Sequence, residues 1–266
     1  MRITVRALPL LIAALVAAPL ALTGCSTTAA TCGPAGSGSC LRILFTGNSY
    51  TFVNDLPLTF AELARAGGHG VETDSLASGG ATLADHMADA ATAPKLDSRK
   101  WDFVVLQEQS EIPAVAASLE DTMYPAARTL VAMIRARNET PILFMTWAHR
   151  DGLPVSGMPD YESMQRSIDT GYLALAQELD VAVAPVGYTW FIVRRQSPEI
   201  ELWQDDGSHP STAGTYLAAC VFYSAVFRQS PDGLDFTDGL SADTARILRK
   251  AAAQEVLAHP GQWGLH

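Results

Sequence analysis

A serine, a histidine and an aspartate in this sequence have the types and spacing that acyl-transfer chemistry uses. Ser49 directly follows an apolar run, and Asp206 precedes His209 by three residues in the segment Asp-Gly-Ser-His-Pro. A free serine hydroxyl is a poor nucleophile and needs a neighbouring base. A single turn would bring the Asp206 carboxylate to the imidazole of His209, where it would fix the tautomer. We therefore predict that Ser49 is the nucleophile, His209 the base and Asp206 the orienting acid.

Each of these assignments has an alternative. A Gly-Asn-Ser stretch commonly caps a helix or a turn, so Ser49 taken alone favours a capping role. Asp205 is a rival acid, although it lies one residue further from His209. His149, at the end of another apolar run, could line the pocket or act as the base, but no acid stands at a comparable spacing on its N-terminal side.

Acyl transfer also needs hydrogen-bond donors where negative charge develops on the substrate. Gly79 and Gly80 lie in a turn that opens a predicted helix, and glycines there let backbone N–H groups approach a substrate. Gln107 ends a buried apolar run, and Gln109 follows two residues later. We expect Gln107 to supply a side-chain donor, with Gln109 as the second candidate. The sequence does not separate Gly79 from Gly80.

The elements that would position these residues follow from hydrophobic periodicity. Short apolar runs alternate with helical patterns, and this alternation indicates a parallel sheet covered on both faces. Ligands of such sheets bind beyond the carboxyl ends of the strands, where the candidate residues fall. We predict strands at 41–46, 70–76, 101–106, 141–147 and 181–186, and helices at 56–66, 120–137, 161–179, 211–227 and 242–257.

The N-terminus predicts an export signal rather than part of the fold. Arg2 and Arg6 precede an apolar stretch that ends in Leu-Thr-Gly-Cys at Cys25. This pattern is similar to the lipobox of bacterial lipoproteins, in which cleavage precedes a cysteine that carries diacylglycerol. An ordinary secretory signal is the alternative, and the stretch is short for a permanent membrane span. We predict a signal peptide over 1–24, lipidation of Cys25, a flexible tether over 25–40 and one catalytic domain over 41–266.

Charge and cysteine usage narrow the classes of partner and cofactor. The net charge is −10, and loss of two arginines with the signal would make it −12, which argues against nucleic acid as a partner. Cys32 and Cys40 flank a Gly- and Ser-rich loop and could form a disulfide in an exported protein. Cys220 lies in an apolar segment and predicts a buried thiol. No spacing resembles a zinc site, and we expect no metal and no cofactor.

The order of these segments resembles that of the SGNH/GDSL hydrolases. Gly-Asn-Ser-Tyr at 47–50 is similar to the first block of that family, Gly-Asp-Ser, and the segment from Asp206 to His209 matches its last block, Asp-x-x-His. The turn at Gly79 and Gly80 resembles the second block. The third block, Gly-x-Asn-Asp, is replaced by Gln-Glu-Gln-Ser at 107–110, which is more similar to the Gln-Gly-Glu-Ser of branches that deacetylate carbohydrates. The resemblance spans about residues 41–228.

This resemblance implies a three-layer, flavodoxin-like α/β/α sandwich with a five-stranded parallel sheet and a Ser49–His209–Asp206 triad. It implies an oxyanion hole made by the Ser49 amide, a glycine amide and a side-chain amide. We expect an exported serine esterase, lipid-anchored to the bacterial cell envelope, that hydrolyses short-chain acyl esters of small molecules or carbohydrates, O-acetyl groups on carbohydrates included. A lipase- or thioesterase-type hydrolase is one alternative, and a non-catalytic, glycan-binding surface lipoprotein is another.

Overall fold

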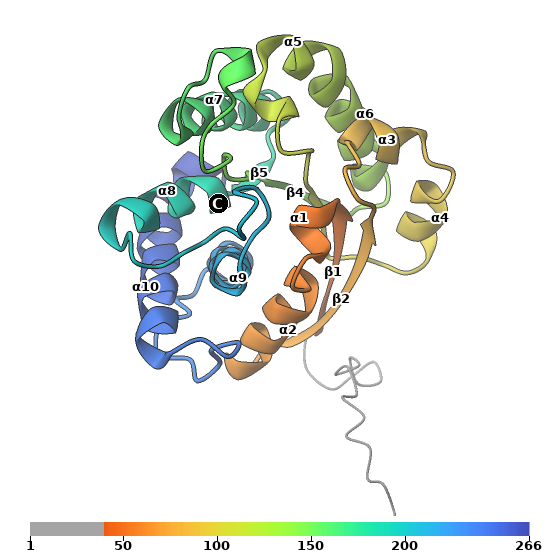
Figure 1. Ribbon diagram of the computed structural model, residues 1–266. Helices are drawn as coiled ribbons and strands as arrows, with labels where there is room; N and C mark the ends of the chain where they lie inside the picture. The colour runs from red at the N-terminus through yellow and green to blue at the C-terminus, as the bar shows by residue number, and fades with distance from the viewer. Residues whose placement is uncertain (1–39, 266) are drawn as a thin grey trace, which may run out of the picture.

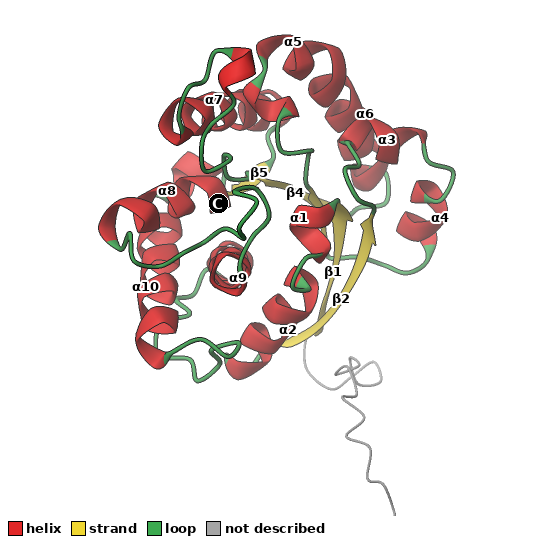
Figure 2. Cartoon of the chain, in the orientation of Figure 1, coloured by secondary structure: helices red, strands yellow, loops and turns green. Residues whose placement is uncertain are grey.

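A five-stranded sheet forms the centre of the fold in the computed structural model, which describes residues 40–265 (Figure 1). The strands run parallel in the order β2-β1-β3-β4-β5. Helices enclose the sheet on both faces (Figure 2), so the predicted three-layer α/β/α sandwich is confirmed. The strands are β1 (Cys40–Gly47), β2 (Gly70–Ala77), β3 (Phe103–Leu106), β4 (Thr140–Phe144) and β5 (Ala182–Ala184).

The continuous apolar sequence of the inner strands explains why both faces are covered. β3 reads Phe-Val-Val-Leu, and three of its four residues are buried; such a strand has no face to offer to water. α2 (Leu56–Ala66) and α9 (Thr212–Phe227) lie on one face, where α8 (Val186–Gln196) and α10 (Ala242–Ala258) pack against α9. The other face carries α3 (Leu83–Ala88), α6 (Tyr124–Arg135) and α7 (Tyr161–Leu179).

Three parts of the structure depart from the elements predicted for this chain. α8 was not predicted, and it shortens the fifth strand because the helix begins at Val186. The helix expected over 120–137 begins with a π-helical turn at Leu119–Met123, followed by α6. Pro125 lies in the first turn of α6 and has no N–H for a regular helical bond, which accounts for the irregular start. The short helices α1 (Ser49–Phe52), α4 (Thr92–Asp97) and α5 (Ala116–Ser118) were also missed.

The strand order distinguishes the position between β1 and β3 from the other positions in the sheet. The chain moves from β1 outward to β2 and then returns across β1 to β3, so the direction of winding reverses between β1 and β3. Open parallel sheets bind ligands in the crevice at such a switch point. The loops that follow β1 and β3 therefore meet where a ligand is expected.

The cysteines and the N-terminus are only partly within the described chain. Cys40 is disulfide-bonded, and Cys220 is a buried free thiol, as predicted. Cys25 and Cys32 lie outside the described residues, so the pairing of Cys32 with Cys40 stays a prediction. The proposed signal peptide and nearly all of the tether lie outside them as well. Between residues 40 and 265, no helix has both the length and the apolar character needed to cross a bilayer.

Candidate active site

A tight turn after β1 presents Ser49. Asn48 caps the short helix α1 by accepting the backbone N–H of Tyr50 at 3.0 Å. Its carboxamide nitrogen donates to the carbonyl oxygen of Ala81 at 2.9 Å, which ties this turn to the loop after β2. Gly47 must lack a side chain, because a Cβ there would lie 2.3 Å from the Gln107 carboxamide oxygen. The capping role and the exposed serine thus coexist in one Gly-Asn-Ser stretch.

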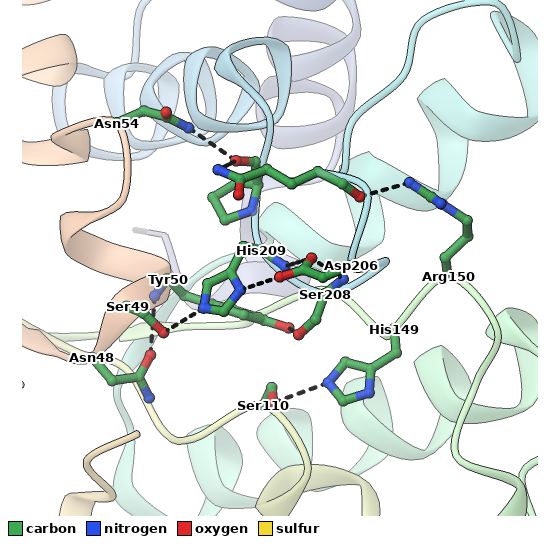
Figure 3. Close-up of polar contacts among 12 residues, drawn as sticks. Asn48, Ser49, Tyr50, Asn54, Ser110, His149, Arg150, Asp206, Ser208 and His209 are labelled. Atoms are coloured by element: carbon green, nitrogen blue, oxygen red, sulfur yellow. Dashed lines mark hydrogen bonds and ion pairs between the residues drawn. The ribbon is translucent and has the colours of Figure 1, made fainter. Parts of the chain in front are cut away.

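Ser49, His209 and Asp206 form a continuous hydrogen-bonded chain, shown in Figure 3. His209 Nδ1 lies 2.6 Å from a carboxylate oxygen of Asp206, and His209 Nε2 lies 2.9 Å from Ser49 Oγ. With its Nδ1 proton directed at the carboxylate, the imidazole leaves Nε2 free to accept the serine hydroxyl proton. The predicted residues are therefore brought together from positions 160 apart in sequence.

The Asp206 carboxylate is held ionised by its surroundings. Its second oxygen accepts the backbone N–H groups of Ser208 and His209, each at 2.9 Å. Partial burial acts to raise the pKa of Asp206, but the bonds from the His209 side chain and from the two N–H groups outweigh it and lower the pKa to about 2. Asp206 therefore carries its negative charge throughout the neutral range.

The rival acid and the rival base occupy other places. Asp205 is exposed, and the carboxylate that reaches His209 belongs to Asp206. His149 lies on the opposite side of the cavity, with Nε2 3.0 Å from the hydroxyl of Ser110 rather than near Ser49 (Figure 3). Burial lowers the pKa of His149, so its imidazole loses its proton at a lower pH than an ordinary histidine does.

A cavity of about 420 Å³ opens in front of the Ser49 hydroxyl. The predicted glycines line one side of it, and Gly80 has a left-handed φ of +72° that favours glycine. Ser49 is the first residue of α1, so its N–H points out of the helix start, unpaired within the helix. Gly79 and Gly80 are not distinguished by their surroundings, since nothing lies within 4 Å of a Cβ built at either position.

The expected placement of Gln107 at the cavity edge is wrong. Gln107 is fully buried, and its carboxamide oxygen accepts the Asn48 N–H and the Thr51 hydroxyl, both at 2.9 Å. Its carboxamide nitrogen donates to the carbonyl oxygen of Glu108 at 2.6 Å. Gln107 therefore supports the turn that carries Asn48 and Ser49, and it does not line the cavity. Gln109 does line the cavity, and its carboxamide oxygen accepts the backbone N–H groups of Glu111 and Ile112.

Substitution of Gln107 should reveal this supporting role. Gln107→Ala is expected to lower the free energy of unfolding by about 1–3 kcal/mol, because the Asn48 N–H would be left buried without an acceptor. Urea unfolding measures this change. Thr51→Val is the matched control: it removes one of the same hydrogen bonds without reaching the cavity and should cost less. A Gln107→Ala enzyme with unchanged unfolding energy and a lower kcat would instead place the carboxamide in catalysis.

Glu108 joins the loops after β2 and β3. One carboxylate oxygen accepts the N–H of Leu83, at the start of α3, at 3.1 Å and that of Gln109 at 2.7 Å. The other oxygen has no partner among the described residues. Burial raises the pKa of Glu108 to about 7, although the two N–H bonds oppose this rise. The side chain thus fixes the loop that carries the glycines against the loop that carries Gln109.

An aromatic column that the sequence patterns did not predict lies beside Ser49, His209 and Asp206. The Tyr50 ring stacks on Trp147 at 4.4 Å, and Trp147 stacks on Trp190 at 4.1 Å. Trp203 meets Trp190 edge-on at 5.3 Å. The Trp147 indole N–H donates to the carbonyl oxygen of Ser208 at 3.0 Å, so the column holds the loop that carries His209. The only sequence signal was the position of these residues beside strand ends and the two catalytic segments.

Polar side chains on the His149 side of the cavity were also not predicted from the sequence. Tyr50 OH lies 2.8 Å from the hydroxyl of Ser208, and Ser110 bonds His149. Ser110 ends the segment that replaces the third family block, which was the available signal. Among residues 40–265 no group of three or more His, Cys, Asp or Glu side chains is arranged to hold a metal ion.

The comparisons with known proteins agree with this fold. A solved structure assigned as an SGNH hydrolase from Slackia heliotrinireducens is 32% identical, with a TM-score of 0.58, and the alignment covers 69% of this chain and 97% of that one. The chain therefore belongs to the SGNH/GDSL hydrolase superfamily.

Two more distant structures share the fold. A DUF4886 family protein from Bacteroides uniformis is 19% identical with a TM-score of 0.72, over 84% of this chain and 96% of that one. A catalytic mutant of an acetylxylan esterase from Geobacillus stearothermophilus is 17% identical with a TM-score of 0.55, over 70% and 94%. No protein-family model matches the sequence, and the search of curated proteins finds no match.

Proposed function

We propose that this protein is a serine esterase that hydrolyses short-chain acyl esters through a covalent acyl-enzyme. The observation that carries the proposal is the chain of hydrogen bonds from Asp206 through His209 to Ser49, which opens on the cavity. A nucleophile bonded to a base, and a base oriented by a third group, are the signature of this mechanism. Membership of a hydrolase superfamily supports it.

The reaction proceeds in two displacements. Ser49 Oγ attacks the ester carbonyl carbon while His209 Nε2 takes the hydroxyl proton, and the Asp206 carboxylate stabilises the imidazolium. His209 then returns this proton to the departing alcohol oxygen as the carbon–oxygen bond breaks. Water attacks the acyl-Ser49 carbonyl carbon and gives a proton to His209. His209 then returns this proton to Ser49 Oγ as the bond between the acyl carbon and Oγ breaks, which releases the carboxylic acid.

The oxyanion that forms in each displacement is assigned to the glycine side of the cavity. The N–H groups of Ser49 and of Gly79 or Gly80 are the backbone donors, and Gln109 is the remaining side-chain candidate because Gln107 faces away. A donor aimed at this position stabilises the transition state more than the ground state. Its contribution is therefore in kcat rather than in KM.

The substrate that we propose is a short acyl group, with acetyl groups on carbohydrates as the leading class. The cavity of about 420 Å³ has hydroxyl, imidazole and carboxylate groups in its walls, which suit a polar ester better than a long acyl chain. The similarity of fold to an acetylxylan esterase supports the same class. A lipase- or thioesterase-type hydrolase would require a longer apolar surface at this position.

Covalent labelling and an ester panel test the proposal together. A fluorophosphonate probe should label the wild-type protein, and mass spectrometry should find the label on Ser49. In the panel, acetyl esters should be cleaved faster than decanoyl esters of the same alcohol, and oxygen esters faster than thioesters. An unlabelled protein that retains glycan binding would support the non-catalytic alternative, and a preference for decanoyl esters would support a lipase.

We further propose that the protein is exported and held in the bacterial cell envelope by a lipid on Cys25. This proposal rests on the sequence alone, since Cys25 lies outside the described residues. Full-length protein expressed in a bacterium should partition into the detergent phase, and mass spectrometry should find diacylglycerol on the Cys25 peptide. Cys25→Ser should abolish the modification, whereas Cys32→Ser, the matched control, should retain it. A soluble mature protein that begins at another residue would overturn the anchor.

A further inference from the structure

The reaction fixes the direction in which the alcohol part of the ester must lie. The carbonyl oxygen has to point to the N–H groups of Ser49 and the glycine turn, while the alcohol oxygen has to reach His209 Nε2 to receive its proton. The alcohol therefore lies on the His209 side of the attacked carbon. We call the part of the cavity lined by Ser110, Glu111, His149 and Ser208 the far wall. His149 and Ser110 stand on that wall, and Ser208 stands beside the base (Figure 3).

This far wall carries two hydrogen-bonded pairs of side chains. Ser110 Oγ lies 3.0 Å from His149 Nε2. The Tyr50 hydroxyl lies 2.8 Å from Ser208 Oγ. Tyr50 and Ser110 are nearly buried, so their hydroxyls are held in place rather than free to rotate away. The triad uses none of these four side chains.

The charges of the side chains on the far wall indicate which class of alcohol the cavity accepts. His149 is half-buried, and its neutral imidazole can both donate and accept a hydrogen bond. No described residue forms a hydrogen bond with the Nδ1 atom of His149, and the imidazole ring lines the cavity. Glu111, on the same wall, would repel an alcohol that carries a carboxylate or a phosphate. A neutral alcohol with further hydroxyl groups fits this combination.

We propose that His149 and Ser110 form a hydroxyl-binding subsite that selects esters of neutral polyols, such as sugars with a free hydroxyl beside the acylated one. This inference rests on the proposed esterase function and names the alcohol that the same cavity accepts. His149 binds that free hydroxyl, and Ser110 fixes the orientation of the imidazole ring. A polar site built for a substrate hydroxyl discriminates strongly against an alcohol that lacks one.

The test compares two acetyl esters that differ only in the alcohol: a mono-acetylated sugar and 4-nitrophenyl acetate, which has no free hydroxyl. The readout is the ratio of kcat/KM for the first to kcat/KM for the second. His149→Leu should lower this ratio about 10- to 100-fold, and Ser110→Ala should lower it by a smaller factor. His149→Gln should restore part of it, because a carboxamide also donates and accepts. His69→Ala is the matched control, since His69 stacks on Phe227 away from the cavity.

An unchanged ratio in both His149→Leu and Ser110→Ala would overturn the subsite. Equal losses on the two esters, with no recovery in His149→Gln, would also overturn it and assign His149 to general support of the cavity. Glu111→Gln adds an independent measurement, because it should raise the relative rate on an acetylated sugar acid; no rise would count against the charge argument. The proposed function is judged separately, by whether wild-type hydrolysis of 4-nitrophenyl acetate depends on Ser49.

Discussion

Ser49→Ala is expected to lower kcat by about 10⁴- to 10⁶-fold while the protein stays folded. The substitution removes the atom that attacks the ester, and no other hydroxyl of the cavity is bonded to His209 Nε2. Ester hydrolysis measured at saturating substrate gives kcat, and the far-ultraviolet circular dichroism spectrum reports the fold. The residual rate should come from binding and from the oxyanion donors alone.

Two controls make this result specific to the nucleophile. Fluorophosphonate labelling should disappear in Ser49→Ala and persist in Ser110→Ala, which alters another serine of the cavity. The melting temperature should change little, because Ser49 is only half-buried and its hydroxyl bonds only His209 among the described residues. A loss in kcat of less than about tenfold would remove Ser49 from the mechanism.

His209→Ala is expected to be nearly as damaging as Ser49→Ala, and the double variant should be little worse than either. The two side chains act as one unit, because the serine hydroxyl is a competent nucleophile only while the imidazole accepts its proton. Asp206→Asn should cost about 10⁴-fold, since a neutral carboxamide at 2.6 Å from Nδ1 would favour the wrong tautomer. Steady-state kinetics on the four variants tests this non-additivity.

The same series decides between the two histidines of the cavity. An inactive His149→Ala together with an active His209→Ala would transfer the role of base to His149. Additive losses in the Ser49→Ala, His209→Ala double variant would show that the two residues act independently. Either result would contradict the hydrogen-bonded chain as the catalytic unit.

The strands and their parallel arrangement could be predicted because local sequence patterns indicate them. Continuous apolar runs identified the inner strands, and the parallel arrangement then placed the candidate residues at one edge of the sheet. The pairing of Asp206 with His209 was equally local, since three residues separate them. Helix α8 was missed because its position follows from packing against α9 rather than from a clear start signal.

The role of Gln107 could not be predicted from its position at a strand end. Either a cavity-facing or a buried carboxamide satisfies the same sequence. The choice depends on the close approach of Gly47 and on the Asn48 N–H, which come from a strand about 60 residues earlier. Likewise, the sequence distinguished His209 from His149 only by the nearby Asp206, and the contact with Ser49 that decides between them joins residues 160 apart. Long-range contacts of this kind are set by tertiary packing.

The aromatic column gives the protein a natural optical reporter of its catalytic loop. Indole rings stacked as closely as Trp147 and Trp190 couple their electronic transitions, so their near-ultraviolet circular dichroism depends on their mutual orientation. Trp147 also donates its indole N–H to the Ser208 carbonyl, one residue before the base. Any displacement of that loop on acylation or substrate binding is therefore transmitted to a chromophore. Absorption and emission of the unlabelled enzyme can follow loop motion during turnover, without an attached dye.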